Sequence, residues 1–305
     1  MLKLAYAKIN LSLDIVGRRE DGYHLVRMLM QTLDIADQIR LSKLEDNEII
    51  ITVSDQRGNM GAKDDISVVP VGQDNLIYKA AYAVLEKYYW NKKKCGGVKI
   101  ELEKHIPVAA GLAGGSSDAA AVMKGINELF ELGVIDQDLM KLGVKLGADI
   151  PYCIMGGTAL SEGIGEELTR LPEIENQIVL VAKPPISVST AEAYGGYDSL
   201  VESGAWIDHP DVDGQVDAVY GGNICKIASY CKNVLEQVTA ANHMEIGQLE
   251  EVMKKYGAIN SIMSGSGPTV FGIFPDMEKA EEASKYIKEN AMAEQIFIAK
   301  TVSRN

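Results

Sequence analysis

Long apolar runs are absent from this sequence. None of its apolar stretches approaches the ~18 residues that a membrane-spanning helix requires. Residues 1–8 also lack the apolar core of a secretory signal peptide. We therefore expect a cytoplasmic protein without a membrane partner.

Cysteine and histidine are scarce, with four of each in the chain. Cys95, Cys153, Cys225 and Cys231 form no C-x-x-C pair, and the histidines form no H-E-x-x-H pattern. A disulfide framework is a feature of short secreted chains, which this one is not. We expect four free thiols in a reducing compartment.

Basic residues are outnumbered: 30 Lys and Arg stand against 43 Asp and Glu, a formal net charge of −13. Nucleic acids and anionic membranes bind basic surfaces, so this balance argues against both as partners. It also limits how a phosphate could be bound. Backbone N–H groups would have to supply much of the attraction, with a few basic side chains focused locally.

The chain itself is of ordinary globular composition. Its 305 residues are 47% hydrophobic and 24% charged, which predicts two domains or one domain with two lobes. A turn is expected at Asp21-Gly22, an irregular loop or short strands over 45–74, and a helix end caused by Pro151. Asp74 and Asn75 are expected to cap a helix. Periodicity predicts strands at 2–16, 98–102, 176–183, 269–274 and 295–302, and helices at 75–92, 118–129, 137–147, 190–200, 223–238, 245–256 and 276–290. The second half, from Gly156-Gly157 on, is predicted to be α+β, with helices on one face of a mostly antiparallel sheet.

The strongest motif is the small-residue segment 107–117, followed by Asp118. It reads Pro-Val-Ala-Ala-Gly-Leu-Ala-Gly-Gly-Ser-Ser, so its backbone is nearly bare before the predicted helix begins. Bare backbone N–H groups at a helix N-terminus bind anions, which predicts a phosphate site. The segment is no Walker A loop, since G-x-x-x-x-G-K-[ST] is absent. The alternative is a tight turn into a helix that Ser116 or Ser117 caps.

Three weaker segments accompany it. Ser264-Gly265-Ser266-Gly267-Pro268-Thr269 precedes a predicted strand and permits close approach of a ligand, or is simply a flexible turn. Lys8 lies in an apolar strand, where burial would require a partner such as Asp149. The alternative for each of these two residues, taken separately, is a solvated surface charge. Asp21-Gly22-Tyr23-His24 is a candidate binding turn, or a plain hairpin turn with an exposed histidine.

Together, in their order along the chain, these four segments resemble the GHMP family of small-molecule kinases over nearly the whole chain. The phosphate segment and the 264–268 loop are typical of the family as a whole. Three further segments, 21–24 with Gln31 downstream, 147–151 and 188–194, are similar to members that act on a cytidyl diphosphate alcohol of the non-mevalonate route to isoprenoid precursors. The resemblance implies an α+β fold with two lobes, a ribosomal S5 domain 2-like N-terminal lobe at 1–160 and a ferredoxin-like C-terminal lobe at 161–305.

The resemblance also implies roles for residues. Asp149 would be the general base and Lys8 its neighbour, which keeps the carboxylate ionised; both are the catalytic candidates. ATP and Mg²⁺ would be required, with Ser116 or Ser117 as a candidate metal contact. The substrate-binding candidates are Asn10, Tyr23, His24, Asp149, Thr190 and Tyr194, with the Tyr194 ring stacked on the cytosine unless it simply packs on the core. The ATP-binding candidates are Pro107, Val108, Ala109, Ala110, Gly111, Leu112, Ala113, Gly114, Gly115, Ser116, Ser117 and Asn75.

Two departures from the family pattern stand out. Ala113 replaces a glycine that many members carry, which should be tolerated unless this residue needs a positive φ. The segment 54–73 is longer than expected and precedes Asn75-Leu76-Ile77, at the nucleotide side. The expected partners are ATP and the small cytidyl diphosphate substrate, with the protein a monomer or a homodimer.

Three alternatives stay open. One is another GHMP enzyme, of the homoserine or phosphomevalonate kinase or the diphosphomevalonate decarboxylase type. A second is a catalytically silent nucleotide-binding homologue. A third, an S5-like RNA-binding module, is disfavoured by the acidic balance.

Overall fold

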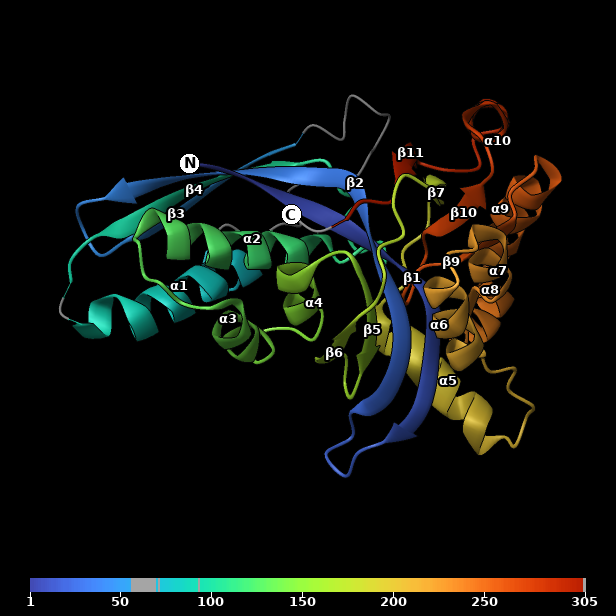
Figure 1. Ribbon diagram of the computed structural model, residues 1–305, viewed down its shortest axis with the longest axis horizontal. Helices are drawn as coiled ribbons and strands as arrows, with labels where there is room; N and C mark the ends of the chain where they lie inside the picture. Colours follow the sequence, from blue (N-terminus) through green and yellow to red (C-terminus); the bar gives the residue numbers. More distant parts are fainter. Residues whose placement is uncertain (56–69, 71, 93, 304–305) are drawn as a thin grey trace. The chain divides into compact units, whose positions relative to one another are not determined.

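The computed structural model describes residues 1–55, 70, 72–92 and 94–303. These residues form two compact units that alternate along the chain. The first unit contains Met1–Ala7, Ile35–Val108 and Ala113–Met155, and the second contains Lys8–Asp34, Ala109–Leu112 and Gly156–Asn305. Two long strands, β1 (Leu2–Arg18) and β2 (His24–Leu44), each contribute residues to both units; they are the blue strands of Figure 1. The predicted division into residues 1–160 and 161–305 stays a prediction.

The first unit packs helices on one face of a sheet. Strand β4 (Gly97–Lys104) pairs antiparallel with β2 and parallel with β3 (Ile49–Asp55). Helices α1 (Leu76–Tyr88) and α2 (Gly114–Leu129) lie side by side against these strands in Figure 1. The shorter α3 (Asp136–Gly143) and α4 (Ile150–Met155) complete the unit, with a 3₁₀ turn at Trp90–Lys92.

The alternation of apolar and polar residues along the strands explains this core. Val98, Ile100 and Leu102 all lie on the buried face of β4, and the apolar stripe of α1 packs against the same core. On α2 the side chains in this core include Ala119, Ala120 and Ala121, whose small size allows the helix to approach its neighbours closely. The core therefore reaches directly to the N-terminal end of α2, where the predicted phosphate segment joins it.

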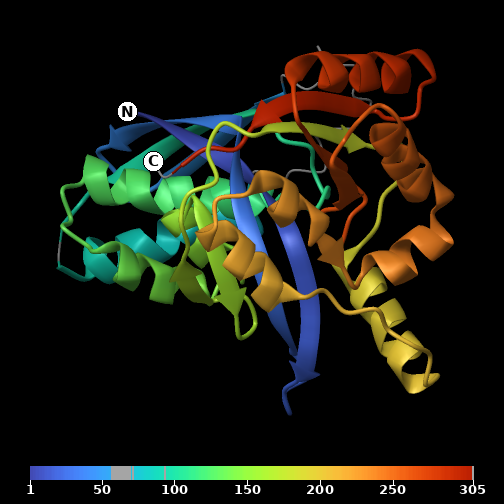
Figure 2. The same cartoon turned by 45° about the vertical axis from the view of Figure 1, so that its right-hand side comes forward.

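The second unit contains a four-stranded antiparallel sheet in the order β11-β7-β10-β9. These strands are β7 (Ile178–Lys183), β9 (Asn260–Met263), β10 (Val270–Phe274) and β11 (Gln295–Lys300). Helix α9 (Met244–Lys255) packs on β9 and β10, and α10 (Met277–Glu289), the red helix of Figure 2, lies along β11. The predicted antiparallel sheet is confirmed.

In the second unit, further strands pair with β1 and β2. Strand β5 pairs with β2 and β6, and β8 pairs parallel with β1. Helix α5 follows β7, and α6, α7 and α8 lie between α5 and α9 in the chain. Their bounds are β5 (Thr158–Glu162), β6 (Glu167–Arg170), α5 (Thr190–Glu202), α6 (Val212–Tyr220), α7 (Ile224–Ser229), β8 (Lys232–Asn233) and α8 (Glu236–Asn242).

Two predicted features are wrong. The helix expected at 223–238 is interrupted by β8, because Lys232 and Asn233 pair with Ser12 and Leu13 of β1 instead of continuing the helix. Pro151 does not stop the preceding helix, which ends at Gly143; it is the second residue of α4, where a missing N–H costs nothing.

Several predicted elements differ from the observed ones in extent. The helix expected at 118–129 begins at Gly114, and the one expected to run to residue 92 ends at Tyr88. Within the expected irregular segment 45–74, Ile49–Asp55 form β3, while 56–69 and 71 lie outside the described residues. Among the described residues, no helix combines the length and the apolar character needed to cross a membrane.

Candidate active site

The N-terminus of α2 is built to leave backbone N–H groups available. The residue before the helix, Ala113, has a left-handed conformation (φ 56°, ψ 28°) and makes no side-chain capping hydrogen bond. The first N–H that bonds back to Ala113 is that of Ser117, at 2.8 Å. The N–H groups of Gly114, Gly115 and Ser116 therefore face the space before the helix, as in anion-binding helix termini. The alternative, with Ser116 or Ser117 as the helix cap, is wrong.

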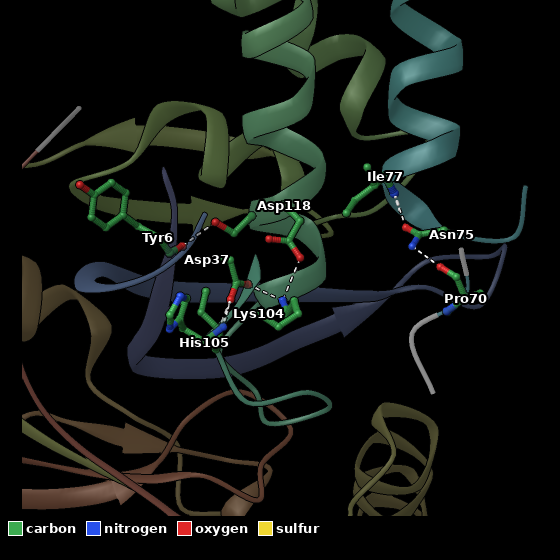
Figure 3. A network of polar contacts seen from close by, with 10 residues as sticks. Tyr6, Asp37, Pro70, Asn75, Ile77, Lys104, His105 and Asp118 are labelled. Carbon is green, nitrogen blue, oxygen red and sulfur yellow. Dashed lines mark hydrogen bonds and ion pairs between the residues drawn. The ribbon is translucent and has the colours of Figure 1, made fainter. Parts of the chain in front are cut away.

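The structure distinguishes the two serines that follow. Ser117 is buried, and its hydroxyl donates a hydrogen bond of 2.6 Å to the carbonyl oxygen of Tyr6, labelled in Figure 3. Ser116 is only half-buried. The Ser117 hydroxyl thus anchors α2 to β1, which makes Ser116 the better candidate to contact a metal or a phosphate.

A buried charge cluster, not anticipated from the sequence, lies beside this helix end. Lys104 at the end of β4 donates hydrogen bonds to Asp37 of β2 and, at 2.8 Å, to Asp118 of α2 (Figure 3). None of the three side chains is more than 4% exposed. Burial lowers the pKa of Lys104, but the charges of Asp118 and Asp37 outweigh it, so the ammonium form is stabilised and the pKa is raised.

Asp118 is the least satisfied member of that cluster. Burial raises the pKa of Asp118 well above its ordinary value, against the opposing charge of Lys104. Its Oδ1 has no hydrogen-bond partner in the structure. One signal in the sequence could have found the cluster: Lys104 continues the buried alternation of Val98, Ile100 and Leu102.

Asn75, a predicted ATP-binding residue, is engaged locally. Its side-chain oxygen accepts a 2.7 Å hydrogen bond from the N–H of Ile77 and so caps α1, as expected from the sequence. Its amide nitrogen donates to the carbonyl of Pro70 (Figure 3). A role of Asn75 toward ATP stays a prediction.

Within the second unit, three of the predicted segments meet: Lys8 with Asn10, the small-residue segment, and the 264–268 loop. Lys8 is buried, and its ammonium donates a 2.7 Å hydrogen bond to the side-chain oxygen of Asn10. The backbone N–H of Lys8 donates to the carbonyl of Leu112 at 3.1 Å. Lys8 is therefore not a solvated surface charge, and it lies beside the middle of the small-residue segment.

The 264–268 loop closes on the same place. The Ser264 hydroxyl donates to the Gly111 carbonyl at 3.1 Å and accepts from the N–H of Asn10 at 3.3 Å. A side chain at Gly111 would place its Cβ 2.1 Å from the Ser264 carbonyl oxygen, so only glycine fits there. Asn233 holds the loop from behind by donating to the carbonyls of Met263 and Gly265 at 2.9 and 2.7 Å. The interpretation of this segment as a merely flexible turn is wrong.

Asp149 lies in the first unit, half-buried, immediately before α4. Its backbone carbonyl accepts a 3.0 Å hydrogen bond from the N–H of Cys153, which fixes its position at the start of that helix. Because Lys8 and Asp149 belong to different units, their pairing stays a prediction.

The predicted cytosine-binding residues include a ring pair. The rings of His24 and Tyr194 lie 4.9 Å apart and are tilted by 41°. His24 Nε2 forms a 2.7 Å hydrogen bond with Asp198 Oδ1, and Arg18 lies 3.2 Å from the other oxygen of Asp198. Asp198, unrecognised in the sequence, therefore fixes the orientation of the His24 ring.

The other two candidates on this side are more loosely held. Tyr23 is 60% exposed at the end of a turn in which the N–H of Arg19 donates to the Tyr23 carbonyl at 2.8 Å. The turn predicted at Asp21-Gly22 is confirmed, whereas an exposed histidine after it is not, since the His24 side chain is 13% exposed. The Thr190 hydroxyl lies 3.3 Å from that of Ser266 and so connects α5 to the 264–268 loop.

Comparisons with known proteins show what this chain is similar to. Residues 75–157 match the GHMP kinases N terminal domain, and residues 222–292 match the GHMP kinases C terminal domain. The 4-diphosphocytidyl-2-C-methyl-D-erythritol kinase of Lachnospira eligens is 46% identical over 297 residues, covering 97% of this chain and 96% of that protein. The enzyme of the same name from Clostridium acetobutylicum is 41% identical over 299 residues, covering 98% and 99%.

Solved structures give the same result for the fold. A crystal structure of a 4-(cytidine 5'-diphospho)-2C-methyl-D-erythritol kinase is similar with a TM-score of 0.78 and 29% identity over 99% of each chain. Homoserine kinase from Cytophaga hutchinsonii is similar with a TM-score of 0.72 at 18% identity, covering 99% of this chain and 95% of that one. The predicted α+β fold with two lobes is confirmed.

Proposed function

Because the chain belongs to the GHMP kinase family, we propose that it transfers the γ-phosphoryl group of ATP to a hydroxyl of 4-diphosphocytidyl-2-C-methyl-D-erythritol. The product is the 2-phosphate, an intermediate of the non-mevalonate route to isoprenoid precursors. The observation that carries this function is the 46% identity to a kinase of that name over nearly the full length of both chains. The charged and aromatic side chains at the predicted positions support it.

Phosphoryl transfer depends mostly on positioning and electrostatics, and the chain supplies both. The N–H groups of Gly114, Gly115 and Ser116 would bind phosphate oxygens of ATP without a basic side chain. This reconciles a phosphate-binding enzyme with a net charge of −13. The 264–268 loop, held against Gly111, supports the middle of the same segment.

Asp149 would take the proton of the attacking hydroxyl, as a carboxylate does when it lies within hydrogen-bond reach of the acceptor. Lys8 would favour the ionised carboxylate and neutralise charge on the transferred group. The buried hydrogen bond from Lys8 to Asn10 holds that ammonium in one orientation. A role of Asn10 toward the substrate stays a prediction.

Mg²⁺ fits this site as an ion bound chiefly through ATP. Among the described residues, no group of three or more His, Cys, Asp or Glu side chains could hold a metal. Mg²⁺ often binds through one or two protein ligands together with substrate phosphates, and the half-buried Ser116 hydroxyl offers one. When bound, the ion would neutralise the charge that develops between the β- and γ-phosphates.

On the acceptor side, the tilted pair of His24 and Tyr194 offers ring faces to a nucleobase. Asp198 keeps the His24 ring oriented, and the other ring nitrogen would form the hydrogen bond to the base. Tyr23 and Thr190 would border the same pocket. A cytoplasmic location, and a monomer or a homodimer, stay predictions.

The test is ATP consumption by the purified protein with Mg²⁺ and the cytidyl substrate, beside homoserine and phosphomevalonate. We expect turnover on the cytidyl substrate alone. Asp149→Ala should lower kcat by on the order of 10²–10⁴, whereas Asp138→Ala, at a half-exposed side chain of α3, should leave it unchanged.

Each contrary outcome has its own meaning. Turnover on homoserine or phosphomevalonate would keep the kinase and overturn the role of His24 and Tyr194. Retained ATP binding without turnover on any substrate would identify a catalytically silent homologue. Full activity of Asp149→Ala would remove Asp149 as the base.

A further inference from the structure

The phosphate loop, residues 107–117, lacks side chains that could hold it in one conformation. Eight of its residues are Gly, Ala or Ser, and Ala109 and Ala113 adopt left-handed conformations with φ of 50° and 56°. Alanine disfavours that conformation, so these two residues must be held there by the surrounding structure. Ordering such a loop before ATP arrives would raise affinity, since less conformational freedom is lost on binding.

The upstream end of the loop is fixed by Asp37. One oxygen of this buried carboxylate accepts the backbone N–H groups of His105 and Ile106, at 2.5 and 2.8 Å. The other accepts from Lys104, the last residue of β4. Asp37 therefore holds three consecutive residues that lead directly into Pro107 (Figure 3).

The downstream end is fixed to the same ammonium group. Lys104 donates to Asp118 at 2.8 Å, in the first turns of α2, just past the loop. The helix start also lies close to Lys104, because a Cβ added at Gly114 would be 3.4 Å from the Lys104 Nζ and 3.1 Å from Ile106. One buried cation thus connects the two ends of the loop.

We propose that Asp37, Lys104 and Asp118 form a clamp that holds the ends of the phosphate loop together and so positions its N–H groups for the phosphates of ATP. The inference rests on the ATP-dependent function proposed above. The three are positioning residues, since each acts on ATP through the loop and not by contact. Charged hydrogen bonds in a buried setting suit this task because they are strong and directional.

The test begins with Lys104→Met, which keeps an unbranched side chain but removes the cation. We expect the apparent Kd for a non-hydrolysable ATP analogue, and the KM for ATP, to rise by roughly ten- to a hundredfold. Binding of the cytidyl substrate, measured by calorimetry without nucleotide, should change by less than about twofold, since the clamp does not contact its predicted residues. A loss of folding alone would weaken both ligands together.

A matched control separates the clamp from the general cost of a lost buried ion pair. Lys183 is 3% exposed and pairs with Glu294 at 2.9 Å in the four-stranded sheet, which contains no predicted ATP-binding residue. Lys183→Met should lower the melting temperature as Lys104→Met does, and leave the affinity for the ATP analogue unchanged. Asp118→Asn keeps an oxygen that accepts from Lys104, so it should bind the analogue within about threefold of the unaltered protein, unlike Asp118→Ala.

The proposal is overturned if Lys104→Met binds the ATP analogue normally, or if its affinities for both ligands fall by the same factor. It is also overturned if Lys183→Met weakens ATP binding as much. These readouts use binding, so they stand even if the unaltered protein does not turn over the cytidyl substrate. In that case the proposed function fails while the clamp is still tested.

Discussion

Two glycine-rich loops of this chain are each held by a carboxylate that accepts backbone N–H groups, and the two carboxylates have different charged neighbours. At the phosphate loop, the buried Asp37 accepts the backbone N–H groups of His105 and Ile106. At the 264–268 loop, Glu236 accepts the N–H of Met263 at 2.7 Å, immediately before the loop. In each case one carboxylate fixes the strand end from which the loop departs.

The balancing group differs. Asp37 faces the ammonium of Lys104, whereas the side chain of Glu236 interacts with another acid, Glu250, and more weakly with Lys254 and Lys232. Burial raises the pKa of Glu236, and burial followed by the charge of Glu236 raises that of Glu250 to about 9. Two neighbouring, half-buried acids do not both ionise readily, so this pair retains a proton at neutral pH. The first arrangement therefore contains a cation, whereas the retained proton makes the second one sensitive to pH.

The largest effect should come from the point at which the two loops touch. Gly111→Ala would place a methyl group 2.1 Å from the Ser264 carbonyl, at a residue whose φ is 74°. Backbone cannot be displaced cheaply there, so both loops must shift. We expect kcat/KM for ATP to fall by about a hundredfold or more.

Gly115→Ala is the matched control for Gly111→Ala. Nothing lies within 4 Å of a Cβ added at Gly115, in the same segment. If both variants are equally impaired, glycine is required along the segment for approach of the phosphates, and contact between the loops is not the cause. If Gly111→Ala is fully active, the loops do not depend on one another.

An intermediate effect is expected at Ala113, where the sequence left a question open. Its φ of 56° is positive, so the methyl group is not free of cost. Ala113→Gly should therefore stabilise the folded protein by up to about 1 kcal/mol, reduced by the larger freedom of glycine in the unfolded chain. Affinity for ATP should stay within about threefold, because the clamp still holds the ends of the loop.

Ala291 offers the comparison for Ala113. Its φ is 50°, and it follows α10, away from any predicted ligand contact in the sequence. Ala291→Gly should raise the melting temperature by a similar amount. A gain at Ala291 with a loss at Ala113 would mean that the alanine in the phosphate loop has a role that its backbone strain does not explain.

Local patterns in the sequence predicted most of the helices but fewer of the strands, since β2, β5, β6, β8 and β9 were not predicted. The alternation of buried and exposed residues also indicates the clamp residues. Lys104 follows Val98, Ile100 and Leu102 on the buried face of β4, and Asp37 lies between the buried Ile35 and Ile39 of β2. A charged residue in phase with buried neighbours is a signal for a buried ion pair.

Other features depend on contacts between segments far apart in the chain, so no local sequence pattern could predict them. The break in the expected helix at 223–238 results from pairing of Lys232 with Ser12 of β1. The distinction between Ser116 and Ser117 rests on a hydrogen bond to Tyr6, more than a hundred residues away. The role of Asp198 requires the approach of α5 to His24. Long-range partners of this kind decide which of two similar residues is available to a ligand.

The smallest effect, on stability alone, should come from the proton that Glu236 and Glu250 retain. The pKa of Glu250 is about 9 in the folded protein and 4.5 ordinarily, so in this range the folded state holds a proton that the unfolded chain has lost. Stability must then fall as the pH rises from 4.5 toward 9. Glu250→Gln removes that proton and keeps the shape of the side chain. Its melting temperature should fall less steeply over the same range and exceed that of the unaltered protein near pH 8 by on the order of one to two degrees. Glu282→Gln, at an exposed residue of α10, should keep the original slope. Parallel melting curves for Glu250→Gln and the unaltered protein would show that no proton is retained, and the contrast between the two loops would disappear.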